Sequence, residues 1–359
     1  MLARLCHRMA ERFAQGGRLL AVAATAPARS DARHVAVEFV HPVIVGKRAL
    51  PALALVGDAE ALSAETGMLA RAQDIVFAFG PDTRGALSAA AERGALTVAF
   101  KAQSGAEWEF SPDEEDPDLA QELVETLYHV LWELVHVFFE HRGLLEGRAE
   151  RQQHDAGASA FLYPFLDERE KNLETVMDDV RRSVLMKSEE ISELRELTLT
   201  ENAGVLEAAA DALRRSFDRG GKLLALGNGG SATDAMDVVA DFRATGHPAI
   251  DLTDDAGILT AIANDIGPEA IFLRQVIAYG QPGDVLIAFS TSGGSANVLA
   301  ALAEARSREL VTIAMVGYGG GAIAREQLAD HVVVVGSEHI PRIQEAQASA
   351  YHVLRELVS

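Results

Sequence analysis

The sequence predicts an α/β protein with two doubly wound domains, each a parallel sheet flanked by helices. Short apolar runs alternate with stretches of helical periodicity in both halves of the chain, which is the pattern of strands and helices in such sheets. Loops rich in glycine and serine at 227–231 and 290–295 each follow an apolar run directly. Several stretches of the first half recur in the same order in the second, which indicates a duplicated domain.

The length of 359 residues is sufficient for two domains. We expect a first domain at 1–145, a linker and long helix at 146–200, and a second domain at 201–359. The region 168–197 has no glycine or proline and carries apolar residues at helical spacing, so it predicts a long helix leading into another at about 201–219. Strands of the second domain are expected at about 222–227, 248–252, 284–289, 310–315 and 331–335.

Composition excludes several classes of partner and compartment. The formal charge of −21 argues against nucleic acid and anionic membrane surfaces as partners. The single cysteine, Cys6, excludes a disulfide framework and is typical of a reducing cytosol. No apolar run approaches the ~20 residues of a membrane span. Residues 4–29 resemble a signal peptide, but a similar stretch recurs later, so we interpret them as a helix and a buried strand of a cytoplasmic protein.

The two loops predict a site for an anionic ligand. They are Gly-Asn-Gly-Gly-Ser at 227–231 and Ser-Thr-Ser-Gly-Gly-Ser at 290–295. Glycines allow the backbone to approach a ligand closely, and a following helix N-terminus directs amides and a partial positive charge at it. The second loop adds hydroxyls and a predicted N-cap at Ser295. Ligands of parallel sheets bind beyond the carboxyl ends of the strands, where both loops are expected.

The duplication is clearest in three pairs of segments. Residues of the first half match residues of the second at 31–39 and 234–242, 74–79 and 284–289, and 121–135 and 344–358. The ligand loops have no counterpart in the first half, because Ala-Thr-Ala-Pro-Ala-Arg occupies 24–29 and Gly-Pro-Asp-Thr-Arg-Gly occupies 80–85. We therefore expect no such ligand in the cleft of the first domain.

Residues 227–359 resemble the SIS (sugar isomerase) domain family, specifically its phosphoheptose isomerase branch. The resemblance rests on residues 227–235, 259–265, 290–299 and 342–345, followed by His352. It implies a parallel sheet that binds a sugar phosphate and isomerises sedoheptulose 7-phosphate to a heptose 7-phosphate. The first domain is then a degenerate SIS-like copy without ligand loops.

The resemblance also implies roles for individual residues of the second half. Phosphate binding is implied for Ser290, Thr291, Ser292 and Ser295. Contacts along the sugar are implied for Asn228, Gly229, Gly230, Ser231, Asn264, Asp265 and Gln344.

Catalytic and metal-binding residues are expected from both halves. The resemblance implies that a His-x-x-x-Glu segment forms a metal-binding and catalytic pair. His34 and Glu38 stand at that position in the first half. A composite site would use Glu38 as the base and His352 as the acid. Its divalent metal, zinc by the resemblance, would be held by His34, Glu38, Gln344 and His352. No nucleotide cofactor is expected.

Several alternatives remain open from the sequence. The second half has Asp237 and Asp241 at the His/Glu positions, so Asp241 is the carboxylate left if no composite site forms. The pair Gln121 and His129 has the same spacing as Gln344 and His352, and either could face the ligand. Buried core histidines and a surface helix pair are the structural alternatives for these groups.

The family resemblance implies homotetramers with active sites at subunit contacts. A duplicated chain can reproduce such an assembly with half as many polypeptides, so we expect a homodimer imitating a tetramer. The apolar helix at 121–135 is expected to take part in it. The alternative to an enzyme is a phosphosugar sensor or an assembly protein on the same fold, since the second half lacks the His/Glu pair.

Overall fold

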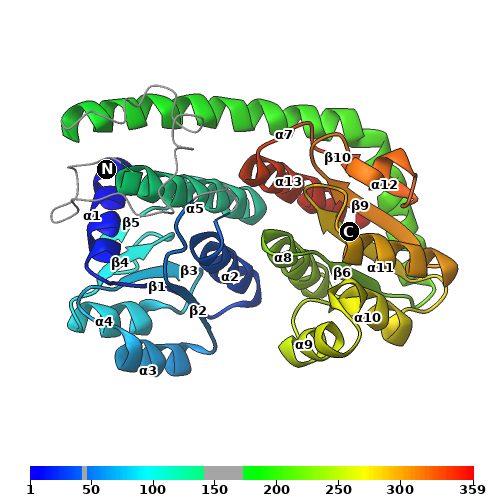
Figure 1. Cartoon of the computed structure of the whole chain (residues 1–359), viewed down its shortest axis with the longest axis horizontal. Helices are drawn as coiled ribbons and strands as arrows, with labels where there is room; N and C mark the ends of the chain where they lie inside the picture. Colours follow the sequence, from blue (N-terminus) through cyan, green and yellow to red (C-terminus); the bar gives the residue numbers. More distant parts are fainter. Residues whose placement is uncertain (43–46, 141–172) are drawn as a thin grey trace. The chain divides into compact units, whose positions relative to one another are not determined.

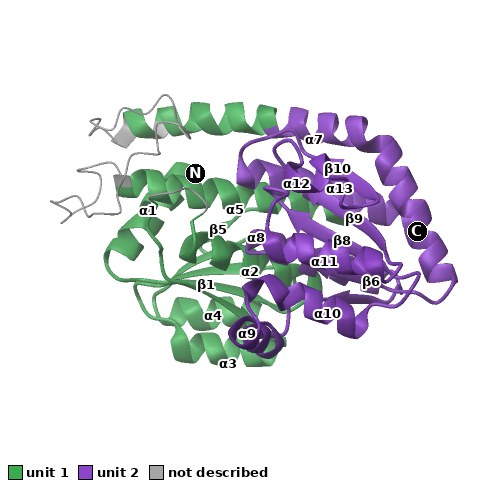
Figure 2. Cartoon of the chain, turned by 45° about the vertical axis from the view of Figure 1, so that its right-hand side comes forward, with its two compact units in different colours: residues 1–190 green, residues 191–359 purple. Residues whose placement is uncertain are grey.

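A computed structural model describes residues 1–42, 47–140 and 173–359, which form two compact units, Met1–Glu190 and Ile191–Ser359 (Figure 2). Each unit is described by itself. The boundary lies within one continuous helix, α7 (Leu173–Asp218), where the sequence predicted a long helix leading into a second. The part of the predicted linker at 146–172 lies outside the described residues.

Unit 1 contains a five-stranded parallel sheet with the order β2-β1-β3-β4-β5 (Figure 1). Its strands are β1 (Leu19–Ala23), β2 (Ala52–Val56), β3 (Ile75–Phe79), β4 (Leu96–Ala99) and β5 (Trp108–Glu109). Its helices are α1 (Leu2–Ala14), α2 (Ala26–Val40), α3 (Ala59–Leu69), α4 (Arg84–Glu92), α5 (Pro117–Glu140) and the first part of α7.

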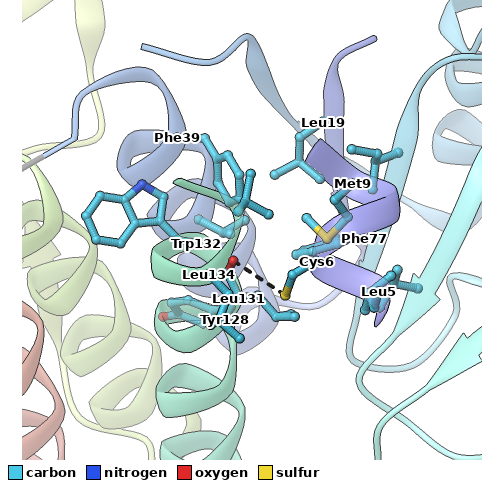
Figure 3. Packing of buried hydrophobic residues seen from close by; sticks show 14 of the residues in the cluster. Leu5, Cys6, Met9, Leu19, Phe39, Phe77, Tyr128, Leu131, Trp132 and Leu134 are labelled. Atoms are coloured by element: carbon cyan, nitrogen blue, oxygen red, sulfur yellow. Dashed lines mark hydrogen bonds between the residues drawn. The ribbon is translucent and has the colours of Figure 1, made fainter. Parts of the chain in front are cut away.

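The central strands β1 and β3 of unit 1 are apolar throughout because helices cover both faces of the sheet. Successive side chains point to opposite faces of a strand, so Leu19 and Ala21 of β1 pack with α1, α2 and α5, whereas Leu20 and Val22 pack with α3 and α4. Figure 3 shows part of the apolar layer between the sheet and the helices α1, α2 and α5. In this layer the buried Cys6 thiol lies 3.8 Å from the Leu131 carbonyl oxygen. This burial on both faces is characteristic of parallel sheets.

Unit 2 repeats this architecture with the strand order β10-β9-β8-β6-β7. Its strands are β6 (Leu223–Leu226), β7 (Ala249–Asp251), β8 (Val285–Ser290), β9 (Val311–Val316) and β10 (His331–Val334). Its helices are the rest of α7, α8 (Gly230–Ala244), α9 (Ala256–Asp265), α10 (Ile271–Tyr279), α11 (Ala296–Ser307), α12 (Gly321–Arg325) and α13 (Ile340–Val358), with the short 3-10 helix η1 (Pro268–Ala270). All five predicted strands are confirmed.

Both units therefore have the strand order 2-1-3-4-5 when each sheet is numbered from its own first strand. In this order the first and third strands are neighbours, and their connections leave in opposite directions, which opens a ligand crevice at their carboxyl ends. In unit 2 these strands are β6 and β8, which pair in parallel with Leu226 beside Ala288. The two predicted ligand loops thus leave adjacent strands.

The helices of the described residues include none that is long and apolar enough to span a membrane.

His136 is an ionisable group inside the apolar layer of unit 1. It lies on α5, 2% exposed, with Nδ1 2.9 Å from the Trp132 carbonyl oxygen and Nε2 3.0 Å from that of Arg48. Burial lowers the pKa of His136 from 6.5 to about 4, and the positive charge of Lys47 acts in the same direction, while the two carbonyl groups oppose the shift. The imidazole is therefore neutral in the folded protein at pH 7.

Replacing His136 by glutamine should reduce the acid sensitivity of unit 1. Between pH 6.5 and 4 the unfolded chain binds a proton at His136 that the folded chain does not, so the free energy of unfolding falls as pH falls through this window. The contribution is about 1.4 kcal/mol per pH unit. Both tryptophans of the chain, Trp108 and Trp132, lie in unit 1, so urea unfolding followed by tryptophan fluorescence measures this unit. The His247→Gln variant in unit 2 is the control, and an unchanged pH slope in His136→Gln would contradict the assignment.

Candidate functional site

The second ligand loop presents hydroxyl groups at the carboxyl end of β8. Ser290 ends the strand with only 4% of its surface exposed, and its buried Oγ has no hydrogen-bond partner. Ser292 Oγ accepts one hydrogen bond, from the Gly294 N–H at 3.3 Å. Ser295 is the N-cap of α11, as predicted, but its hydroxyl makes no capping hydrogen bond. Hydroxyls at a helix N-terminus are suited to an anionic ligand.

This loop is held in place by close backbone packing. Gly293 has a φ of 59°, a conformation that favours glycine. A Cβ at this position would overlap the carbonyl group of Gly320, which belongs to the loop after β9. The Thr291 carbonyl oxygen also accepts a hydrogen bond from the Gly317 N–H at 3.0 Å. The loop is therefore shaped before any ligand binds, which lowers the entropy cost of binding.

A reciprocal amide pair joins the two ligand loops. Asn228 Nδ2 donates to Asn297 Oδ1 at 2.9 Å, and Asn297 Nδ2 donates to Asn228 Oδ1 at 2.9 Å. Asn297 lies in the first turn of α11 and was not among the predicted site residues. Its position two residues after Ser295, inside a motif already recognised, is the signal that could have identified it.

Gln344 of α13 lies against the first ligand loop of its own unit. Its side chain is 1% exposed and packs so closely on Gly230 that a Cβ there would overlap the Gln344 amide. Gln344 Nε2 donates to Asp234 Oδ2 at 3.3 Å. Within unit 2, Gln344 is therefore the glutamine beside the loop that precedes α8.

The carboxylates of α8 continue along the same helix face toward α13. Tyr351 Oη donates to Asp237 Oδ2 at 2.8 Å, so the residue that replaces the family histidine is engaged by a buried tyrosine. One turn further, Asp241 Oδ2 lies 3.7 Å from His352 Nε2. This separation is longer than a hydrogen bond. Both side chains are largely buried, and the pair can exchange a proton with a ligand placed beside it.

The structure places Asn264 and Asp265 in the last turn of α9, where both are exposed. Asn264 Nδ2 donates to Asp265 Oδ1 at 2.7 Å. Ser231, in the first turn of α8, is buried. The predicted sugar contacts of these residues stay predictions.

The corresponding helices of unit 1, α2 and α5, bring buried imidazoles and carboxylates together. Gln121 Nε2 donates to Asp31 Oδ1 at 3.1 Å. This hydrogen bond corresponds to the one from Gln344 to Asp234 in unit 2. The Nε2 atoms of His34 and His129 are 3.3 Å apart. His34 also lies 3.9 Å from Glu38 and 3.9 Å from Glu125. Burial, and then the neighbouring His129, lower the pKa of His34 well below 6.5, so its imidazole is neutral.

The donor atoms of His34, Glu125 and His129 fit a divalent metal. They lie within 4.8 Å of one another, and all three side chains are buried. Zn–N distances of about 2.0–2.1 Å in a tetrahedral site place two nitrogens roughly 3.3–3.4 Å apart, which agrees with the 3.3 Å between the imidazoles. Sequence reasoning missed Glu125, although its spacing of four residues from both Gln121 and His129 places it on the same face of α5.

Unit 2 taken by itself offers a poorer metal site. The position of His34 is occupied by Asp237 and that of Glu125 by Ala348. Among the described residues of unit 2, no three histidine, cysteine or acidic side chains gather within metal-binding distance. The predicted four-ligand set draws His34 and Glu38 from unit 1 and Gln344 and His352 from unit 2, and it stays a prediction.

Comparison with known proteins agrees with this geometry. A family model described as the SIS domain matches residues 188–317. The phosphoheptose isomerase of a Roseiflexus species is 42% identical over 190 residues, which are 50% of this chain and 94% of the relative. That of Chlorobaculum tepidum is 45% identical over 174 residues, 46% of this chain and 82% of the relative. The C-terminal domain of glucosamine-fructose-6-phosphate aminotransferase from Francisella tularensis shares the fold over 97% of this chain and 86% of its own, with a TM-score of 0.55 at 12% identity.

The protein is therefore an α/β protein with two SIS-like units, and the chain belongs to the SIS domain family. Through about half of its length it belongs to the phosphoheptose isomerase branch of that family. These relatives support the assignment of the chain to the sugar-phosphate isomerases as a class.

Replacing both Ser292 and Ser295 by alanine should weaken sugar-phosphate binding by roughly a hundredfold or more. Each hydroxyl is expected to donate to a charged phosphate, and such hydrogen bonds contribute about 1.5–3 kcal/mol. Titration calorimetry with sedoheptulose 7-phosphate measures the loss. The control is Ser307→Ala at the far end of α11, where the hydroxyl donates to the Glu304 carbonyl oxygen. Unchanged affinity in the double variant would exclude the loop as the phosphate site.

Proposed function

We propose that the chain isomerises a sugar phosphate between aldose and ketose forms in unit 2, with sedoheptulose 7-phosphate and a heptose 7-phosphate as the two partners of the reaction. The observation that carries this proposal is the arrangement of unit 2 itself. Two preshaped ligand loops leave the adjacent strands β6 and β8, and Gln344 contacts the first of them. The Asp241–His352 pair lies further along the helices α8 and α13.

The second ligand loop, residues 290–295, binds the phosphate in this proposal. Its hydroxyl groups and the first amides of α11 donate hydrogen bonds, so binding does not require a cation in a chain whose formal charge is −21. The sugar extends from this loop toward Asn228 and Gly230, and the amide pair of Asn228 and Asn297 fixes the distance between the two ends.

The isomerisation requires a proton to move between two adjacent carbons. A carboxylate removes the proton from the carbon next to the carbonyl group, and an acid gives a proton to the carbonyl oxygen, which forms an enediol. Return of the proton to the other carbon, and loss of a hydroxyl proton, completes the reaction. We assign the carboxylate to Asp241 and the acid to His352, because these two side chains lie together in the unit that carries the ligand loops. The composite site with Glu38 as base is the alternative.

We further propose that His34, Glu125 and His129 hold a divalent metal in unit 1, with zinc as the ion that the two imidazoles favour. When bound, such an ion would supply Lewis-acid chemistry toward a carbonyl oxygen and would crosslink the two helices. The three side chains would hold the ion from α2 and α5, and the part-buried Gln121–Asp31 hydrogen bond fixes the relative position of these helices.

A phosphosugar sensor or assembly protein is the second candidate function. It is favoured by the sequence of unit 2, which has Asp237 and Asp241 where the family has its His/Glu pair. Asp237 accepts a hydrogen bond from Tyr351 instead. A sensor would bind sedoheptulose 7-phosphate through intact loops and would show no turnover with or without added divalent metal.

Asp241→Asn should lower kcat by about 10²–10⁴ with little change in binding affinity, since it removes a proton acceptor and almost no volume. Glu38→Gln is the matched variant in unit 1 and should retain most of the activity. The measurement is steady-state turnover of sedoheptulose 7-phosphate, combined with calorimetric affinity. An inactive Glu38→Gln beside an active Asp241→Asn would demonstrate the composite site. Absence of turnover in the parent protein, with binding retained, would establish the sensor.

The double variant His34→Ala with His129→Ala should lose about one equivalent of zinc per chain, because it removes both imidazole ligands. Metal content is measured by elemental analysis after zinc loading and dialysis. The control is His247→Ala in unit 2, which should bind as much zinc as the parent. Trp132 fluorescence verifies that unit 1 remains folded. Equal zinc content in all variants would exclude the site.

A further inference from the structure

Unit 1 has a cleft of about 280 Å³ at the carboxyl ends of β3 and β4. It is lined by residues drawn from 78–84 and 99–104. The strand–loop–helix segment β3–α4 is the counterpart of β8–α11. In unit 2 that segment carries the second ligand loop. The cleft thus lies at the place in unit 1 where the second ligand loop was lost.

The lining of this cleft has a net positive charge. Arg84 and Lys101 contribute two cations, and Asp82 contributes one carboxylate. Arg84 Nη2 donates to the Gln103 carbonyl oxygen at 2.6 Å, which uses only one of the five N–H groups of a guanidinium. A local excess of cations is notable in a chain with 53 acidic and 32 basic residues.

The wall of the cleft at 103–105 is held by Glu109 of β5. Its carboxylate accepts hydrogen bonds from Ser104 Oγ at 2.8 Å and from the backbone N–H groups of Gln103 and Gly105 at 3.0 and 2.8 Å. These bonds, that of the Ser104 hydroxyl first, lower the pKa of Glu109 and keep it ionised. The Glu109 carboxylate therefore holds residues 103–105 in place.

We propose that this cleft binds a small phosphate-bearing molecule, with Arg84 and Lys101 replacing the hydroxyl groups that unit 1 has lost. A guanidinium can contact two phosphate oxygens at once, and a lysine adds a point charge. The volume corresponds to roughly nine liquid waters at about 30 Å³ each, which is sufficient for a phosphate group and a short carbon chain. This inference revises the expectation that unit 1 binds no sugar phosphate, and it does not depend on turnover in unit 2.

Calorimetric titration of the full chain with inorganic phosphate and with glucose 6-phosphate tests the proposal. The Ser292→Ala, Ser295→Ala background weakens the loop of unit 2, so that the remaining binding reports unit 1. One site per chain is expected for the phosphate compounds, and none for glucose. Tighter binding of glucose 6-phosphate than of inorganic phosphate would identify a phosphomonoester as the ligand class, and the reverse order would identify free phosphate.

In this background, Arg84→Gln with Lys101→Gln should lower phosphate affinity by at least tenfold. The matched control is Arg71→Gln with Arg93→Gln, which changes the net charge equally. Both residues are exposed. They precede β3 and β4 and so lie near the amino ends of these strands, whereas the cleft lies at the carboxyl ends. Equal weakening in the two double variants would show a general charge effect and would overturn the proposal, as would the absence of any phosphate binding.

Asp82→Asn provides a test in the opposite direction. It removes the carboxylate from the lining, so affinity for inorganic phosphate should rise severalfold. Asp82 has a φ of 63°, a conformation that asparagine tolerates at least as well as aspartate, so the fold is retained. A variant that only disturbed the loop would not bind phosphate more tightly, and unchanged or weaker binding would count against the proposal.

Discussion

Both units depend on a row of buried polar contacts between two helices, α2 and α5 in unit 1 and α8 and α13 in unit 2. In unit 2, Asp234 and Asp237 of α8 accept hydrogen bonds from Gln344 and Tyr351 of α13. An unsatisfied buried polar group costs about 1–3 kcal/mol, so each contact fixes the rotation of one helix against the other. The first turn of α8 carries Gly230, which packs on Gln344. The buried row therefore sets the position of the first ligand loop, and through it the site.

The same row is where the two units differ most clearly in chemistry. In unit 1, His34 and Glu125 stand where unit 2 has Asp237 and Ala348, so the row becomes a cluster of imidazoles and carboxylates instead of a tyrosine–aspartate contact. The fold is compatible with either version, since both units have the same strand order. A cluster of potential metal ligands and a pair of ligand loops are thus separable features of this fold, and the chain carries one in each unit.

Much of the fold could be predicted because the strands of unit 2 are short apolar runs bounded by glycine-rich turns. Parallel topology predicted that the loops at 227–231 and 290–295 lie at the same end of the sheet, and the structure shows that their strands β6 and β8 are neighbours. Side-chain partners between distant elements could not be predicted, since they depend on packing that no local pattern encodes. Asn297 and Glu125 lay inside recognised segments, but only the structure shows their contacts with Asn228 and His34. The cationic cleft of unit 1 was missed because Arg84 and Lys101 are 17 positions apart in sequence.

The two proposed phosphate sites use different physical means within one acidic chain. The loop around Ser292 relies on hydroxyls and helix amides, whose partial charges act over short distances. The cleft around Arg84 and Lys101 relies on full charges, whose attraction is screened by salt. Binding in unit 2 should therefore change little with ionic strength, whereas binding in unit 1 should weaken as salt is added. A chain with a formal charge of −21 repels anions at long range. The preshaped loop of neutral donors in unit 2 binds a phosphate through short-range hydrogen bonds, without a long-range attraction.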